Sequence, residues 1–241
     1  METSIQTVGL ANLALAFIPV ALVLFIYYRW SLNYRNATYA VARMLVQLLT
    51  VGYCLAYLLS TDLPAIVMAV LLLMIVISSW IALNTVLEYR KALLGQAILA
   101  IALGGGLTLL VISQAVLQVD PWYAPQYMIP LGGMVFANAM TSVSLSAERF
   151  RSEIEHGDDF NEARAIAFNA SLIPVVNSLF AVGLVSLPGM MTGQILSGVS
   201  PFIAARYQIM VMCMLFSASG ISAALFITLI KSHLVARIKA E

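Results

Sequence analysis

Charged residues divide the chain into seven long uncharged runs, and this division constrains the fold more than any other feature. The runs cover residues 3–28, 44–61, 63–87, 92–119, 121–147, 165–205 and 207–230. A helix needs about 18 to 20 apolar residues to cross a hydrocarbon core of about 30 Å, and each run reaches that length. Only 10% of the residues are charged, against about 25% in a typical soluble domain. The chain is therefore an integral membrane protein.

We predict an all-α, polytopic fold in which residues 1–241 form a single transmembrane domain. The expected spans are about 8–28, 39–60, 64–87, 92–116, 128–147, 165–187 and 206–230. Glycines at 104–106 and 132–133 fall inside two of these spans. Small residues let helix backbones approach closely, so we expect these glycines to lie at packing contacts, with a hinge as the alternative at 104–106.

The lysines and arginines set the expected orientation, because such residues resist translocation and concentrate in cytoplasmic segments. Eleven of the twelve fall on one predicted side: Arg29, Arg35, Arg43, Arg90, Lys91, Arg149, Arg151, Arg164, Lys231, Arg237 and Lys239. This distribution predicts an N-terminus outside and a C-terminus in the cytoplasm. Arg206, at the start of the seventh span, is the one basic residue on the outer side.

The run from Ala165 to Ala205 is too long for one span, and its second half is rich in glycine, proline and polar residues. Irregular backbone at membrane depth is tolerated only where protein or a water-filled cavity covers it. An eighth span over 188–205 would place the basic C-terminal tail outside. We therefore predict an irregular external segment at 188–205, either a loop or a re-entrant segment.

Side chains around this external segment are the candidates for a transport pathway or gate. They are Met190, Met191, Thr192, Gln194 and Arg206, together with Asn138 of the fifth span. The partner of the Arg206 guanidinium would be an anionic substrate, a carboxylate such as Asp62, the carbonyls of the loop or a lipid phosphate. For Asn138 the alternative is helix packing.

Methionines also gather near the expected outer cavity, at positions 128, 134, 140, 190 and 191. Thioether sulfur is a ligand for soft metals, but methionine is also an ordinary apolar filler of membrane helices. Hard cations such as ferric iron prefer carboxylate oxygen, and the predicted outer side offers only Glu2, Asp62 and Asp120. The identity of any metal stays unknown at this level.

The one sizeable hydrophilic segment is the predicted cytoplasmic loop 148–164. Its charges alternate at helical spacing, with Arg149 one turn from Glu153 and Arg151 one turn from Glu155. We predict a short surface helix that breaks at Gly157 and restarts with Asp158 or Asp159 as N-cap. The segment is either a solvated connector or a docking element for a cytoplasmic partner. The acidic residues of its stretch 153–162, the candidates for such a docking element, are Glu153, Glu155, Asp158, Asp159 and Glu162.

Two polar pairs lie near the cytoplasmic ends of the adjacent second and third spans. Arg43 and Gln47 stand one turn apart on the second span, and Asn84 and Glu88 stand one turn apart on the third. Because polar groups inside spans need partners, we predict an Arg43–Glu88 ion pair that fixes this hairpin. A substrate gate is the alternative role.

Several classes of function are disfavoured. The chain has no Gly-x-x-x-x-Gly-Lys-Ser/Thr phosphate loop, so it cannot hydrolyse ATP by that mechanism, and we expect neither enzymatic activity nor a cofactor bound by this chain. The net charge of +1 and the lack of a basic cluster argue against a nucleic-acid partner. The expected surroundings are the lipid bilayer and other proteins.

Residues 187–201, LPGMMTGQILSGVSP, followed by ARYQIM at 205–210, resemble the signature of the bacterial iron export permease family. Plant relatives of this family are associated with aluminium tolerance. RMLVQLLTVG at 43–52 and IPLGGMVFANAM at 129–140 are further matches. The resemblance covers nearly the whole chain in order.

The resemblance implies the permease subunit of an ABC-type transporter in the bacterial inner membrane. Such a subunit would pair with itself as a homodimer and with a separate cytoplasmic ATPase subunit that uses ATP, and it would export iron or another metal ion. The stretch 153–162 would then be the coupling element, and 185–201 an outer gate or exit lining.

Two positions depart from the family pattern. Members of the family carry a longer inner segment that contains a Leu-Gly-Ala-Thr turn. Here the segment is several residues shorter, and His156 to Asp159 runs almost directly into the sixth span. Asn177 and Phe180 replace an acidic and a basic residue of the family. An ATP-independent channel or secondary carrier of the same fold therefore stays an alternative, as does a helper protein that does not transport.

Overall fold

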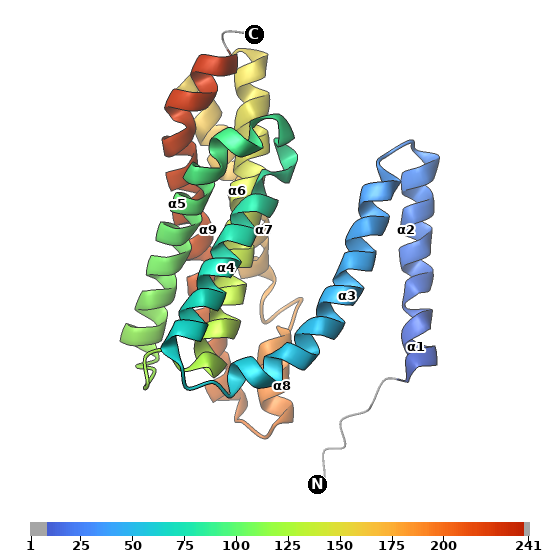
Figure 1. The fold of residues 1–241 in the computed structure, drawn as a ribbon, viewed down its shortest axis with the longest axis vertical. Coiled ribbons are helices and arrows are strands. Elements are labelled where there is room, and N and C mark those ends of the chain that lie inside the picture. Colours follow the sequence, from blue (N-terminus) through green and yellow to red (C-terminus); the bar gives the residue numbers. More distant parts are fainter. Residues whose placement is uncertain (1–8, 239–241) are drawn as a thin grey trace. The chain divides into compact units, whose positions relative to one another are not determined.

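The computed structural model describes residues 9–238, which form two compact units (Figure 1). The first unit ends at Ser60 and the second begins at Thr61. Residue 8, Glu2 and Lys239, which the sequence predictions include, lie outside the described residues. Each unit is described by itself, and the single domain over residues 1–241 stays a prediction.

The first unit is a helical hairpin. Its helices are α1 (Leu10–Leu15), α2 (Phe17–Arg29) and α3 (Tyr34–Leu59). The side chain of Asn33 caps α3 by accepting a hydrogen bond from the backbone N–H of Asn36 at 3.1 Å. The rings of Tyr28 and Tyr34 meet edge to face across the turn, with centroids 5.6 Å apart.

The second unit is a bundle of long helices in which α6 and α9 are central. Its elements are α4 (Pro64–Ala82), the short 3-10 turns η1 (Leu83–Thr85) and η2 (Leu87–Tyr89), α5 (Arg90–Leu110), the π-helical η3 (Val111–Val116), α6 (Pro125–His156), α7 (Phe160–Ala181), α8 (Gly189–Leu196) and α9 (Pro201–Ile238). Helix α6 packs against α4, α5, α7 and α9, and α5 also packs along α9.

Two of the predicted glycine contacts hold these helices together. A Cβ on Gly104 of α5 would lie 2.6 Å from the backbone nitrogen of Ser222 in α9. A Cβ on Gly132 of α6 would lie 2.5 Å from a methyl of Leu71 in α4. The packing role is therefore confirmed at both positions, and at Gly104 a side chain would collide with the backbone of the neighbouring helix. Gly106 and Gly133 would meet nothing within 4 Å.

Seven of the described helical segments are long and apolar enough to cross a membrane, which confirms the predicted number of spans. They cover residues 11–29, 34–55, 64–85, 87–116, 125–156, 160–181 and 201–231. All regular structure in residues 9–238 is helical, apart from one isolated bridge between Val182 and Ser186. The outside placement of the N-terminus stays a prediction.

The cytoplasmic loop predicted at 148–164 is instead a helical hairpin. Helix α6 continues to His156, because nothing in its sequence interrupts the helix and its charges pair along the exposed surface. Gly157 ends α6 with a φ of 102°, and Asp159 caps α7 by accepting from the N–H of Asn161. The break at Gly157 and the restart at Asp159 are confirmed, whereas the separate surface helix is wrong.

The segment 188–205 is less irregular than predicted. Helix α8 occupies 189–196, and α9 already begins at Pro201. The prolines precede or open helices, where the missing N–H needs no partner. Gly198, with a φ of 91°, supplies the turn between α8 and α9. The irregular backbone is confined to 182–188 and 197–200.

Candidate functional site

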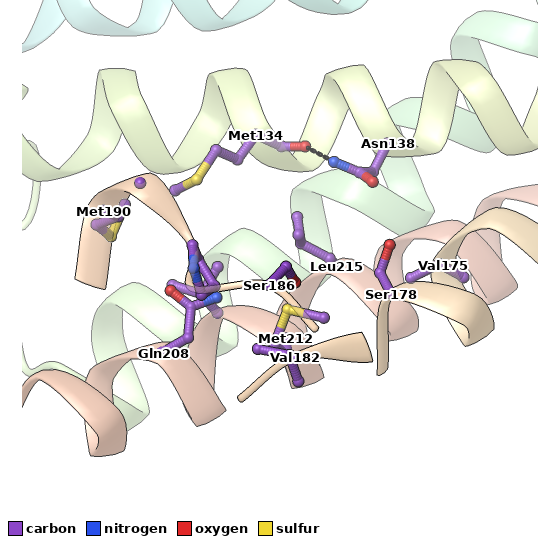
Figure 2. Close-up of a pocket in the computed structure, with 13 residues that line it drawn as sticks. Met134, Asn138, Val175, Ser178, Val182, Ser186, Met190, Gln208, Met212 and Leu215 are labelled. Carbon is purple, nitrogen blue, oxygen red and sulfur yellow. Dashed lines mark hydrogen bonds between the residues drawn. The ribbon is translucent and has the colours of Figure 1, made fainter. Parts of the chain in front are cut away.

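A cavity of about 340 Å³ opens between α6, α7, α8 and α9 of the second unit (Figure 2). The residues that line it are Met134, Asn138, Val175, Ser178, Val182, Ser186, Pro188, Gly189, Met190, Gln208, Val211, Met212 and Leu215. Figure 1 shows α8 at the end of the bundle opposite the α6–α7 turn. The cavity therefore lies toward the α8 end.

Helical spacing brings the polar and sulfur-bearing side chains to this cavity. Met134 and Asn138 stand one turn apart on α6, and Gln208 and Met212 stand one turn apart on α9. The start of α8 adds Met190. Residues four apart share one helix face, so two helices each present an amide and a thioether to the same space.

The two amides differ in their hydrogen bonds. Asn138 donates from Nδ2 to the backbone oxygen of Met134 at 2.9 Å, which leaves its carbonyl oxygen for the cavity (Figure 2). Gln208 is only 6% exposed, and its side chain makes no hydrogen bond with any residue in 9–238. Its amide borders the open space of the cavity, where a water or a ligand can take its hydrogen bonds.

The residues that line this cavity are all uncharged. Three of them are methionines, at positions 134, 190 and 212. In the described part of the chain, no three His, Cys, Asp or Glu side chains lie together in a way that could hold a metal ion. Chemically, the cavity offers thioether sulfur, amide groups and hydroxyls.

Of the predicted gate residues, two line this cavity, Met190 and Asn138. Met191 lines a neighbouring cavity of about 350 Å³ with Cys213, and Gln208 and Met212 border both cavities. Both cavities therefore share one wall on α9.

The other three predicted gate residues lie outside both cavities. Thr192 donates its hydroxyl to the backbone oxygen of Pro188 at 3.1 Å, which stabilises the first turn of α8. The side-chain oxygen of Gln194 is buried and makes no hydrogen bond in the described structure. Arg206 is exposed and forms no ion pair within residues 9–238.

Sequence reasoning missed Gln208 and Met212. The available signal was a glutamine inside the last uncharged run, two residues after Arg206, with a methionine one turn further on. Polar residues inside spans are costly unless they face a cavity or another helix. Applied to Gln208, that rule would have placed α9 beside the cavity.

At the other end of the bundle, Arg151 of α6 joins two elements. Its guanidinium lies 3.0 Å from the carboxylate of Glu88, in the turn before α5, and 2.6 Å from that of Glu155. It also lies over the ring of Tyr89, 5.4 Å from the centroid. The predicted partner of Glu88, Arg43, belongs to the first unit, so the Arg43–Glu88 pair stays a prediction.

The acidic residues of the α6–α7 hairpin divide into two groups. Glu153, only 8% exposed, pairs with Arg149 at 2.6 Å, Glu155 pairs with Arg151, and Asp159 caps α7. The side chains of Asp158 and Glu162 have no hydrogen-bond or ion-pair partner among the described residues. Beside the turn, these two carboxylates are therefore free of protein partners in the described part of the chain; Glu148, two turns earlier on α6, is also exposed and unpaired there.

Aromatic contacts tie the hairpin to α9. The ring of Phe160, the first residue of α7, meets Phe150 of α6 edge to face at 5.6 Å. The ammonium group of Lys231 in α9 lies over the same ring, 4.6 Å from its centroid. Three helices therefore meet at Phe160.

Comparison with known proteins gives a consistent family. The family described as "Uncharacterised protein family (UPF0014)" matches residues 10–235. A UPF0014 membrane protein of Synechocystis is 37% identical over 76% of this chain and 77% of its own length. The "Probable iron export permease protein FetB" of Escherichia coli is 34% identical over 88% of this chain and 86% of its own length.

A plant relative also matches. The "Protein ALUMINUM SENSITIVE 3" of Arabidopsis thaliana is 29% identical over 89% of this chain and 83% of its own length. No solved structure matches the chain at a significant level. The resemblance to the iron export permease family is thus confirmed, and the seven spans make this a multi-pass protein of the bacterial inner membrane. The chain belongs to the UPF0014 family.

Proposed function

We propose that the chain is the membrane permease subunit of an ABC-type exporter. In this proposal it forms a homodimer, carries iron or another metal ion, and is driven by a separate cytoplasmic ATPase subunit. The name of the Escherichia coli relative, a probable iron export permease, supports the transport class. The N-terminus would lie outside and the α6–α7 turn in the cytoplasm, as the basic residues indicate.

One observation carries the proposal: a single helix, α6, both lines the cavity and ends in the charged hairpin. Met134 and Asn138 face the cavity, whereas Arg151 and Glu155 lie near the turn. At 1.5 Å per residue, Met134 and Glu155 are about 30 Å apart along the helix. This is close to the thickness of a bilayer core. A force on the hairpin would therefore reach the cavity through one continuous helix.

The contacts around the hairpin provide two further routes. Arg151 connects α6 to the turn before α5, through Glu88. Phe160 connects the start of α7 to α9, through Lys231. Because α9 also carries Gln208 and Met212, a displacement of the hairpin would alter two walls of the cavity together.

Asp158 and Glu162 are the expected docking residues. They are the carboxylates nearest the α6–α7 turn that have no partner in the described structure, and Glu162 lies in the first turn of α7. Charged groups at the rim of an interface mainly set partner choice and association rate. A basic surface on the ATPase would complement them.

Co-purification with a candidate cytoplasmic ATPase subunit tests the proposal. We expect the complex to form with the native chain and to weaken with the double variant Asp158→Lys, Glu162→Lys. Asp120→Lys is the matched control, because Asp120 is an exposed carboxylate outside the hairpin, in the segment before α6. Equal recovery of the ATPase with all three chains would exclude this docking surface.

The second candidate function is an ATP-independent channel or carrier. The turn of only three residues, Gly157 to Asp159, favours it, because so short a turn offers a partner little surface beyond the helix ends. Metal flux through the purified chain without nucleotide would support this candidate over the first.

A further inference from the structure

Three methionines on three different elements line the same cavity. Met134 belongs to α6, Met190 to α8 and Met212 to α9. Figure 2 shows Met134 and Met190 on the α6 and α8 side, with Met212 and Gln208 on the α9 side. The thioethers therefore come to one cavity from segments that are far apart in the sequence.

Packing alone does not explain this arrangement. A methionine that serves as filler closes gaps, and protein interiors leave few voids larger than a water molecule. Here the three methionines border about 340 Å³ of open space. The side-chain amide of Gln208, which makes no hydrogen bond in the described structure, opens to the same space. Thioether and amide groups are therefore available there to a bound species.

The charge of the lining limits what that can be. Desolvating an ion in an uncharged site is expensive, and the cost rises steeply with ionic charge. Hard, highly charged cations also prefer carboxylate oxygen, whereas thioether sulfur selects soft ions such as Cu(I). A soft ion with a single charge combines the lowest desolvation cost with the best match to sulfur.

We propose that this cavity binds a soft monovalent cation of the Cu(I) type through the thioethers of Met134, Met190 and Met212. The amide oxygens of Asn138 and Gln208 face the bound ion and support it electrostatically. The inference rests on the proposed function, since it names the substrate class of the same transport cavity.

Equilibrium binding to the full-length protein in nanodiscs of neutral lipid tests the inference. Ag(I) in chloride-free buffer is the probe, and Cu(I) is measured by competition with a chromogenic Cu(I) chelator. We expect saturable binding that weakens by at least about tenfold in each of Met134→Leu, Met190→Leu and Met212→Leu. Leucine conserves volume, so these variants should fold. X-ray absorption of bound silver should show sulfur neighbours.

Two controls make the result specific. Met128→Leu removes a methionine that lines a different cavity, and it should leave the affinity unchanged. Cys213→Ser removes the thiol of the neighbouring cavity, and it should also leave the affinity unchanged. Affinities equal to the native value in all three cavity variants would overturn the inference. So would loss of binding in Cys213→Ser alone.

Failure of this inference can be told apart from failure of the proposed function. ATPase association with nucleotide-driven flux of another metal, but without Ag(I) binding, would overturn the soft-ion inference alone. Ag(I) binding that depends on the three methionines, in a chain that never associates with an ATPase, would support the inference and overturn the ABC-type mechanism.

Discussion

The two ends of α6 differ in how their polar groups are satisfied. Around the cavity the side chains are uncharged, and the side-chain amide of Gln208 has no partner in the described structure. Around the hairpin, Arg149 and Arg151 are paired with carboxylates on the same helix or in η2. Under the proposed function, the groups that would bind a substrate stay available, whereas the groups that would transmit a force are tied to their neighbours. The difference indicates a binding end and a rigid end.

The largest effect should come from breaking the contact that holds α9 against α5. In Gly104→Ala the new methyl would meet the backbone of Ser222, with 2.6 Å to its nitrogen and 2.9 Å to its Cα. We expect a loss of about 1–3 kcal/mol in the free energy of unfolding, because a backbone must shift. Thermal unfolding in detergent measures it.

Gly106→Ala is the matched control on the same helix, because a Cβ there meets nothing within 4 Å. Its unfolding temperature should be unchanged or slightly raised, since alanine is more favourable than glycine in a helix by about 1 kcal/mol. Equal destabilisation by both substitutions would contradict the packing account and with it the position of α9 at the cavity.

Reversing the charges of Asp158 and Glu162 should lower ATP-driven transport without changing substrate binding at the cavity. In the Asp158→Lys, Glu162→Lys variant, we expect ATP-driven flux to fall about tenfold, equivalent to about 1.4 kcal/mol of association. Substrate affinity at the cavity should not change. A parallel loss of affinity would show that the ends are not separable.

Removing the amide of Gln208 should affect function without much effect on stability. In Gln208→Leu, we expect the free energy of unfolding to change by less than about 1 kcal/mol, because the amide borders the open cavity and has no protein partner to lose. Substrate affinity should fall in the same variant. Destabilisation without a change in affinity would assign the amide a structural role instead.

The smallest effect should be found at the rigid end. Glu88 is 69% exposed and Arg151 is 27% exposed, so solvent screens their attraction. A double-mutant cycle with Glu88→Gln and Arg151→Gln should give a coupling energy of about 0.5 kcal/mol. A double-mutant cycle with Glu88→Gln and Arg43→Gln tests the predicted Arg43–Glu88 ion pair. An absence of coupling would exclude that pair.

Much of the fold follows from the sequence, because the cost of burying charge in lipid divides the chain into its spans. Local chemistry also predicted the turn at Gly157 and the cap at Asp159. The length of α6 and the helical character of α8 were missed, because a hydrophilic or glycine-rich segment can still be helical when its charges pair or its prolines stand at helix starts.

The candidate site was less accessible to sequence reasoning. Asn138 and Met190 were predicted, but Gln208 and Met212 reach the cavity only because α9 packs against α6, α7 and α8. The Glu88–Arg151 pair joins residues far apart in the chain, and no local pattern indicates that contact. Tertiary packing determines both the position of α9 at the cavity and the Glu88–Arg151 contact. The periodicity of a single helix carries no information about either.

Metal flux across the wall of a reconstituted vesicle is the most direct test of the central claim. The full-length chain would be measured with its ATPase and ATP, with the ATPase and no nucleotide, and alone. We predict flux only in the first condition, and its loss in the Asp158→Lys, Glu162→Lys variant. Flux of equal rate in all three conditions would contradict the account.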